Sequence, residues 1–233
     1  MKIALFGYGK MGKMIEQMAL GRGHVITARV DIGTTDIDFS DMEVAIDFST
    51  PDAALENISS CLEHGVAVIS GTTGWLKDYD KVVDLCNKKN GAFIYASNFS
   101  LGVNIFFELN TYLAKMMHNL KEYKPALEEI HHTQKLDAPS GTAITLAQGI
   151  IENTDYRDWK LNNDGEKTIP ISSKRVDAVP GTHTVSYHSE VDSIEIRHTA
   201  HNREGFALGA VIAAEWILGR TGIFSMKDVL NLG

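Results

Sequence analysis

The sequence predicts an α/β fold, in which a Rossmann-type doubly wound parallel sheet is joined to a second α+β domain with a mixed or antiparallel sheet. Three observations predict it. Strand-like and helix-like segments alternate over the first hundred residues, and a glycine motif follows the first of these strands. Later, three strand-like runs follow one another without helices between them. Alternation favours a parallel sheet, and strands without intervening helices favour antiparallel pairing.

The first half of the chain supplies the elements of the parallel sheet. We expect strands at residues 2–6, 24–30, 43–48, 66–70 and 92–96, of which 2–6 and 66–70 read as buried. Thr50 and Pro51 fit the N-cap and first position of a helix that ends before Gly65. Because ligands bind at the carboxyl ends of parallel strands, the loops after these strands should converge on one binding edge.

The glycine motif Gly7-Tyr8-Gly9-Lys10-Met11-Gly12 lies between a strand and a helix, and Asp31 closes the next strand nineteen residues beyond Gly12. This context favours a dinucleotide-binding turn over a simple glycine-rich connection. Gly7 permits the tight turn, Gly9 lets the backbone approach a pyrophosphate, and Gly12 allows close packing of helix and strand. Asp31 is expected to accept hydrogen bonds from the ribose hydroxyls.

The second half contains the elements of the other domain. A helix is expected over residues 101–119 and leads out of the first domain. Its apolar residues at helical spacing are Ile105, Leu109, Tyr112 and Met116. A polar stretch over 153–167 is expected to be irregular, and strands are expected at 125–132, 169–176, 183–190 and 193–199, the last two forming a hairpin at 191–192. An apolar helix over 206–218 should return to the first domain. We therefore expect residues 1–99 and 206–233 to form the dinucleotide-binding domain and residues 100–205 the substrate-binding and oligomerisation domain.

Composition excludes several classes of partner. The 233-residue chain is 44% hydrophobic and carries a formal charge of −8, which argues against nucleic acid and anionic membranes. We find no apolar run near the ~20 residues of a membrane span and no signal peptide. Cys61 and Cys86 lack metal-type spacing and are expected to be buried thiols in a reducing compartment, so we expect a cytoplasmic location.

One stretch near the middle concentrates chemistry-bearing residues. A strand ends at His131 and His132, Lys135 follows on a short connection, and Ser140-Gly141-Thr142 opens a helix with Ser140 as its N-cap. Side chains alternate along a strand, so the two imidazoles should point to opposite faces. Free amides at a helix start favour an anion. Although each feature alone is more often structural, together they predict acid–base chemistry on a small carboxylate-bearing substrate.

The nine histidines do not predict a metal site. His198 and His201 are three residues apart on a strand, which places them on opposite faces, and the adjacent His131 and His132 diverge for the same reason. We also see no carboxylate or thiol at a useful spacing. The sequence therefore predicts no metal centre.

The run E-x-H-H-x-x-K-x-D-A-P-S-G-T-A resembles the signature of the dihydrodipicolinate reductase family, nicotinamide-dependent enzymes of the diaminopimelate route to lysine. The resemblance extends from G-Y-G-K-M-G through G-T-T-G and A-S-N-F-S-L-G-V-N to R-E-G-F-A-L-G-A. It implies reduction of 4-hydroxy-tetrahydrodipicolinate with NADH or NADPH and a homotetramer assembled through the second-domain sheet. It implies that His131 donates or accepts a proton, that Lys135 donates one, and that the substrate dicarboxylate is held by His132, Ser140, Gly141 and Thr142. It further implies cofactor contacts from Gly7, Tyr8, Gly9, Lys10, Met11, Gly12, Asp31, Gly71, Thr72, Thr73, Ala96, Ser97, Asn98 and Phe99.

Two departures from the family pattern bear on the cofactor. The first glycine motif is one residue shorter than in many members, and Ile32 stands where many place a basic residue after the acid. A 2′-phosphate would therefore face Asp31, which favours NADH, although Arg29 leaves NADPH open. Two other functions also stay open: a related dehydrogenase for another small imino or amino acid, and a nicotinamide-sensing protein without catalysis.

Overall fold

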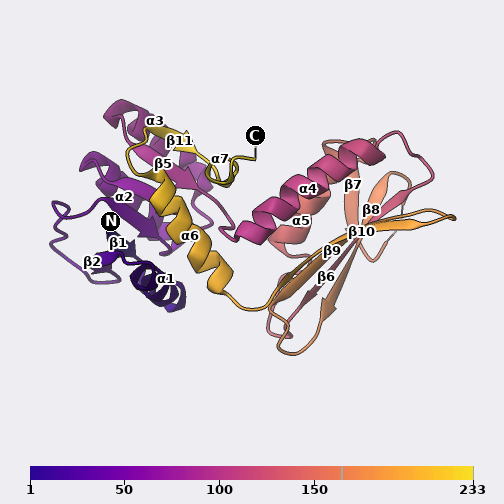
Figure 1. Cartoon of the computed structure of the whole chain (residues 1–233), viewed down its shortest axis with the longest axis horizontal. Helices are drawn as coiled ribbons and strands as arrows, with labels where there is room; N and C mark the ends of the chain where they lie inside the picture. The colour runs from indigo at the N-terminus through magenta and orange to yellow at the C-terminus, as the bar shows by residue number, and fades with distance from the viewer. Residues whose placement is uncertain (164, 233) are drawn as a thin grey trace. The chain divides into compact units, whose positions relative to one another are not determined.

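The computed structural model describes residues 1–163 and 165–232 and divides the chain into two compact units (Figure 1). The first unit comprises Met1–Leu101 and Glu204–Gly233, and the second comprises Gly102–Arg203. Each unit is built around its own sheet. Across the described residues, every helix is too short or too polar to cross a bilayer.

The first unit contains a six-stranded sheet in the order β11-β5-β4-β3-β1-β2, and every pairing in it is parallel. Its strands are β1 (Lys2–Phe6), β2 (Val25–Val30), β3 (Val44–Asp47), β4 (Ala67–Ser70), β5 (Ala92–Tyr95) and β11 (Gly222–Phe224). Its helices are α1 (Lys10–Gly21), α2 (Pro51–Glu63), α3 (Tyr79–Lys89), α6 (Glu204–Ile217) and α7 (Met226–Leu230), with a 3₁₀ turn at Leu76–Asp78. This is the predicted Rossmann-type sheet, and Thr50 and Pro51 begin α2 as expected.

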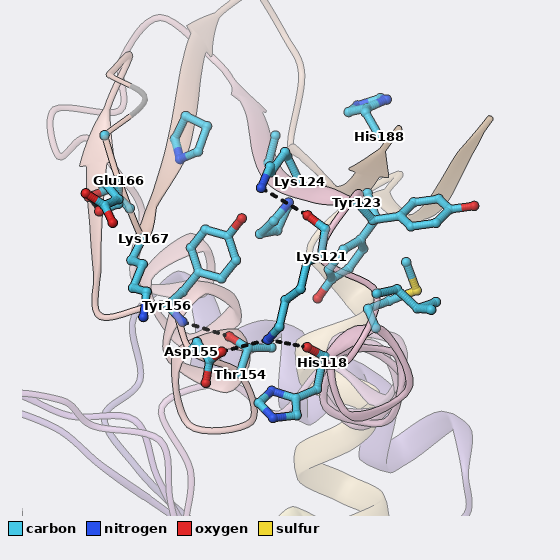
Figure 2. Close-up of a pocket in the computed structure, with 18 residues that line it drawn as sticks. His118, Lys121, Tyr123, Lys124, Thr154, Asp155, Tyr156, Glu166, Lys167 and His188 are labelled. Carbon is cyan, nitrogen blue, oxygen red and sulfur yellow. Dashed lines mark hydrogen bonds and ion pairs between the residues drawn. The ribbon is translucent and has the colours of Figure 1, made fainter. Parts of the chain in front are cut away.

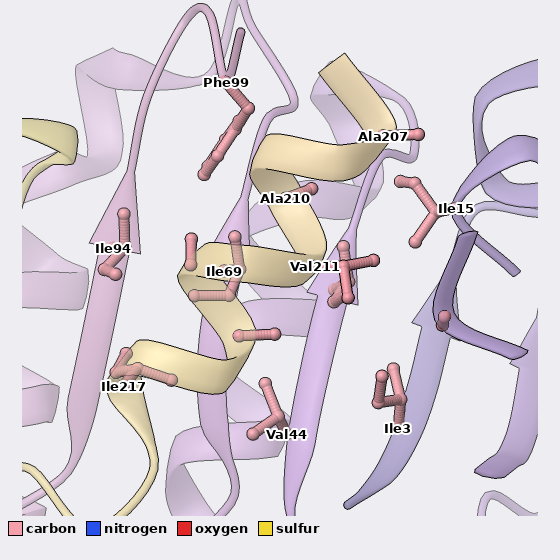
Figure 3. Close-up of a cluster of buried hydrophobic side chains, with 14 of the residues drawn as sticks. Ile3, Ile15, Val44, Ile69, Ile94, Phe99, Ala207, Ala210, Val211 and Ile217 are labelled. Carbon is pink, nitrogen blue, oxygen red and sulfur yellow. The ribbon is translucent and has the colours of Figure 1, made fainter. Parts of the chain in front are cut away.

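Helix α6 closes one face of this sheet with small apolar side chains (Figure 3). Ala207, Ala210, Val211 and Ile217 are fully buried against strands from the first hundred residues. At Gly209 the approach is so close that an added Cβ would lie 1.7 Å from the backbone oxygen of Phe99. The return of the chain to the first unit therefore depends on a glycine at this helical position.

The second unit contains a five-stranded mixed sheet in the order β10-β9-β6-β8-β7. Its strands are β6 (Lys124–His131), β7 (Asp158–Leu161), β8 (Thr168–Arg175), β9 (Gly181–His188) and β10 (Ser193–Ala200). β6 pairs antiparallel with β9 and parallel with β8, and β9 and β10 form the predicted hairpin. Helices α4 (Leu101–Met117) and α5 (Gly141–Ile151) contribute to the hydrophobic core on one face of the sheet.

Two expectations about these elements were wrong, and two elements were not predicted. The stretch predicted to be irregular contains β7, whose four residues carry too weak an alternation to indicate a strand. The predicted stripe of α4 is the exposed one: Tyr112 is 64% exposed, whereas Phe106 and Leu113 are buried in the core. Both faces of α4 carry apolar residues, so periodicity alone did not select the buried face. Finally, β11 and α7 were not expected at all.

Candidate active site

The glycine turn after β1 has the geometry that its spacing predicts. Gly7 has φ of +88°, and a Cβ there would lie 2.2 Å from the backbone oxygen of Phe48. A Cβ on Gly12 would lie 2.2 Å from the oxygen of Gly7. Gly9, the N-cap of α1, differs from both because nothing lies within 4 Å of its added Cβ. The structure therefore needs Gly7 and Gly12 for packing, whereas Gly9 leaves open space in front of a helix start, where a pyrophosphate fits.

This difference gives a prediction for Gly9. Gly9→Val should fold normally, because its side chain meets no protein atom, but it should fill the space that a pyrophosphate would occupy. We expect at least a tenfold rise in the Kd for the dinucleotide, or about 1.4 kcal/mol, measured by fluorescence titration. Gly21→Val in α1 is the matched control, since its added Cβ also meets nothing within 4 Å. Equal Kd values for the two variants would contradict the assignment.

The loops after β3 and β4 are tied together by the buried carboxylate of Asp47. It accepts hydrogen bonds from Ser49 (2.6 Å), Ser70 (2.9 Å) and Thr72 (2.7 Å). Burial raises the pKa of Asp47 and these donors oppose the rise. Thr72, a predicted cofactor contact, is therefore a buried internal donor that shapes the loop. Its neighbour Thr73 is exposed.

The loop after β5 is buried at its end. Phe99 is 1% exposed and its ring packs in the core beside Phe48, so only its backbone is left for a ligand. Ser97 is exposed, while Ala96 and Asn98 are half-buried. The side chain of Asn98 caps this loop by accepting from the Ser100 amide at 2.9 Å. Of this predicted group, Ser97 is the side chain most accessible to a cofactor.

The end of β2 presents Asp31 to solvent. Among the described residues, its carboxylate accepts one hydrogen bond, from the backbone amide of the next residue, Ile32, at 2.9 Å. Arg29 is engaged elsewhere: its guanidinium pairs with Glu16, which also accepts from the Tyr8 hydroxyl. The hydrogen bond from Arg29, with that from Tyr8, lowers the pKa of Glu16. Asp31 is thus free for ribose hydroxyls, and Arg29 is committed to an ion pair.

In the second unit, β6 delivers His131 into a buried polar cluster that sequence reasoning missed. Glu129, two residues earlier on the same face of the strand, is fully buried. One of its oxygens, Oε2, lies 3.6 Å from His131 Nδ1 and 3.7 Å from Nε2 of His183 on β9. The rings of His131 and His183 stand edge to face with centroids 5.0 Å apart. The i−2 spacing of Glu129 was readable from the sequence, but the approach of His183 depends on strand pairing.

Burial keeps both imidazoles of the cluster neutral near pH 7. It lowers the pKa of His183 to about 4, with the neighbouring His131 adding to the effect. Burial also lowers the pKa of His131, although the Glu129 carboxylate acts in the opposite direction. His132 is less buried and lies just beyond the end of the strand, so the two adjacent histidines have different environments. That their side chains point to opposite faces stays a prediction.

Lys135 lies on the connection after β6 with a partner that we had not expected. Its Nζ donates to both carboxylate oxygens of Asp137 at 2.8 Å. The Lys135 hydrogen bond lowers the pKa of Asp137. Arg175 on β8 holds this connection by donating to the backbone oxygens of Lys135 (3.2 Å) and Asp137 (2.6 Å). Lys135 is thereby positioned by β8 as well as by β6.

Helix α5 begins as predicted. The Ser140 hydroxyl accepts from the Ala143 amide at 3.2 Å, and Ala143, Leu146, Ala147 and Ile150 form the buried face. Since Ser140 is 3% exposed and also contacts His183 Nε2 at 3.1 Å, its side chain is structural. Gly141 is exposed, and its added Cβ meets nothing within 4 Å. The first amides of a helix lack intrahelical partners, so those of Gly141 and Thr142 fit an anion such as a carboxylate.

Glu129, His131 and His183 also bring three side-chain atoms that could bind a metal, one carboxylate oxygen and two imidazole nitrogens, within 4.8 Å of one another. The carboxylate is already engaged: Ser140 N–H and Ser173 Oγ donate to it, and the Arg175 guanidinium lies 3.4 Å away. A dication would compete with that guanidinium and displace these donors. The absence of a metal stays a prediction, but our reason for it was incomplete because it overlooked Glu129.

The second unit also contains a cavity of about 620 Å³ at the other end of β6 (Figure 2). Lys124 and Pro125 line it, whereas His131 ends the same strand. Lys121 is committed there to Asp155 at 2.6 Å (Figure 2). This cavity is separate from the cluster around Glu129.

Both units match known proteins. A family model described as "Dihydrodipicolinate reductase, N-terminus" matches residues 1–99, and one described as "Dihydrodipicolinate reductase, C-terminus" matches residues 102–230. The chain belongs to the dihydrodipicolinate reductase family. The predicted family is thereby confirmed.

Relatives named 4-hydroxy-tetrahydrodipicolinate reductase match the chain over almost its whole length. One from Christiangramia forsetii is 57% identical over 99% of this chain and 98% of its own length. One from Methanosarcina acetivorans is 37% identical over 99% of this chain and 89% of its own. A dipicolinate-bound dihydrodipicolinate reductase from Paenisporosarcina sp. TG-14 has a TM-score of 0.80 at 22% identity, covering 97% and 98% of the two chains, which supports the fold. As a dihydrodipicolinate reductase, the chain is an oxidoreductase that uses NADH or NADPH, as expected.

Proposed function

We propose that the chain reduces 4-hydroxy-tetrahydrodipicolinate to tetrahydrodipicolinate with NADH or NADPH, in the diaminopimelate route to lysine. The observation that carries this proposal is the 57% identity, over nearly the full length of both chains, to a reductase of that name. The residues of the second unit suit the chemistry, because they offer a cation, an imidazole and a helix start that can meet a dicarboxylate.

Each residue then has a role in the proposed reaction. A bound nicotinamide would supply a hydride, negative charge would develop on the substrate ring, and the 4-hydroxyl group would leave as water. Lys135 Nζ donates a proton to that ring, and His131 accepts or donates a proton beside it. The amides of Gly141 and Thr142 bind one substrate carboxylate, and His132 contacts the substrate. Asp137 is 61% exposed, and an exposed ion pair is weak, so Lys135 can exchange it for the substrate.

Oxidation of NADH or NADPH at 340 nm, with substrate formed in situ from aspartate semialdehyde and pyruvate, tests the function. Turnover that requires both precursors is expected. Cofactor binding without turnover would favour the nicotinamide-sensing protein. Turnover only with another imino or amino acid would favour the related dehydrogenase.

The preference for NADH is a separate prediction. Asp31 faces the position of a 2′-phosphate without a cation after it, and Arg29 is paired with Glu16. We therefore expect kcat/KM for NADH to equal or exceed that for NADPH, measured side by side in the same assay. A tenfold preference for NADPH, about 1.4 kcal/mol, would show that another basic residue binds the phosphate.

We also propose a homotetramer assembled through the sheet of the second unit, in the cytoplasm. In the core of the second unit, side chains of α4 and α5 pack with Leu127 and Val185 on one face of the sheet. Glu128 follows Leu127 on β6, so its side chain points to the opposite face of the sheet. There it forms an ion pair at 2.5 Å with Lys174 of β8. Light scattering coupled to size exclusion tests the proposal, and a monomer at micromolar concentration would contradict it.

A further inference from the structure

Glu129 is the most completely buried carboxylate of the second unit among the residues that the structure describes, and it links four elements. From β6 it accepts from Ser173 Oγ on β8 at 2.7 Å and from the Ser140 amide at the start of α5 at 3.0 Å. Arg175 lies 3.4 Å from the same oxygen as Ser173. Burial opposes the charge of Glu129, but the donors at Ser140 and Ser173 outweigh it and lower its pKa. The cluster therefore contains a fixed negative charge at neutral pH.

That charge lies against one particular nitrogen of His131. Glu129 Oε2 is 3.6 Å from Nδ1, while a Cβ at Gly181 would lie 3.2 Å from Nε2. A carboxylate next to Nδ1 favours a proton on that nitrogen and stabilises the imidazolium. A side chain at residue 181 would therefore crowd Nε2. The two nitrogens of His131 thus have separate surroundings.

We propose that Glu129 is a positioning residue that holds the proton of neutral His131 on Nδ1 and directs Nε2 to the substrate. The hydrogen bond that Glu129 accepts from the Ser140 amide anchors the carboxylate-binding start of α5. The proposal rests on the proposed function for the role of His131. It joins the proton-transferring strand end and the anion-binding helix end through one carboxylate. Glu129 therefore contacts both the end of β6 at His131 and the start of α5 at Ser140.

The charges around His131 decide the sign of the expected change. Glu129 favours the protonated form of His131, and Lys135, Arg175 and His132 disfavour it. Removing the negative charge of Glu129 leaves only cationic or titratable neighbours, so the imidazolium should become harder to form. An opposite charge within this distance typically shifts a titration by about 1–3 pH units.

Glu129→Gln tests the charge while keeping the shape. We expect the NMR titration midpoint of the His131 ring to fall by about one pH unit or more. The matched control is Glu128→Gln, on the adjacent residue, whose carboxylate pairs with Lys174 and not with a histidine. The control should leave the midpoint unchanged. An unchanged midpoint in folded Glu129→Gln overturns the proposal.

A second measurement needs no variant and covers the case in which Glu129→Gln does not fold. The ¹⁵N shifts of wild-type His131 above its titration midpoint should show protonated Nδ1 and bare Nε2. The opposite tautomer overturns the proposal.

The pH profile of kcat/KM separates this inference from the proposed function. If the ring titration shifts and the pH limb of kcat/KM moves with it, both stand. If the ring titration shifts and the pH profile does not, Glu129 controls His131 as inferred, but His131 is not the proton-transferring group.

Discussion

Lys135→Ala is expected to lower kcat by about 10²–10⁴-fold, the usual contribution of general acid catalysis. The proposed donation from Nζ occurs mainly in the transition state, so its loss should affect kcat more than cofactor binding. The ion pair with Asp137 does not provide an alternative explanation, because an exposed pair contributes little to stability. The measurement is steady-state kinetics at saturating substrate.

The control for this variant is Lys81→Ala, which removes a lysine from a comparable pair with Asp78, 2.7 Å apart, in the first unit. It should retain wild-type kcat, and both variants should bind NADH normally by fluorescence. His131→Ala should resemble Lys135→Ala, less severely if water replaces the imidazole, whereas His132→Ala should act chiefly on KM. Wild-type turnover by Lys135→Ala would refute the catalytic assignment.

Gly209→Ala is expected to destabilise the first unit by about 3 kcal/mol, the upper end of the usual range for overpacking. The added Cβ would lie 1.7 Å from the backbone oxygen of Phe99, and a backbone atom cannot rotate away as a flexible side chain can. Helix α6 would have to move off the sheet and expose part of its buried alanine face. Urea denaturation measures the change.

The comparison variant is Gly21→Ala in α1, where the same methyl group meets nothing within 4 Å. There only the helix propensity changes, which favours alanine by up to about 1 kcal/mol. The two substitutions should therefore change stability in opposite directions. A midpoint for Gly209→Ala equal to that of wild type would show that α6 can adjust without cost.

The parallel sheet was predictable because its strands are short apolar runs separated by clear helix signals, such as Thr50-Pro51 before α2. The buried face of α4 was not, since the exposed side of the helix carries apolar residues such as Ile105 and Met116 just as the buried side carries Val103 and Met117. Local signals also indicated Ser140 as the N-cap of α5. They did not indicate that His183 would meet Glu129, because that contact depends on the pairing of β6 with β9.

The predicted cofactor loops of the first unit show the same difference between local contacts and contacts that depend on the topology. Its spacing predicted tight contacts for Gly7 and Gly12, and both are present. The buried role of Thr72 could not be predicted, because it depends on Asp47, twenty-five residues earlier, turning its carboxylate towards the same loop. Side chains within one element follow local rules, whereas contacts between elements require the topology.

The discontinuity of the first unit has a consequence for synthesis on the ribosome. Its sheet acquires α6 and the edge strand β11 only after residue 204, whereas the second unit is a continuous segment. At about 5–20 residues per second, the hundred residues between the two parts take roughly 5–20 seconds to be made. Throughout that interval the nascent chain exposes the apolar surface that Val211 and Ile217 later cover. The first unit therefore begins to be made before the second and is completed after it, with part of its apolar surface exposed in between.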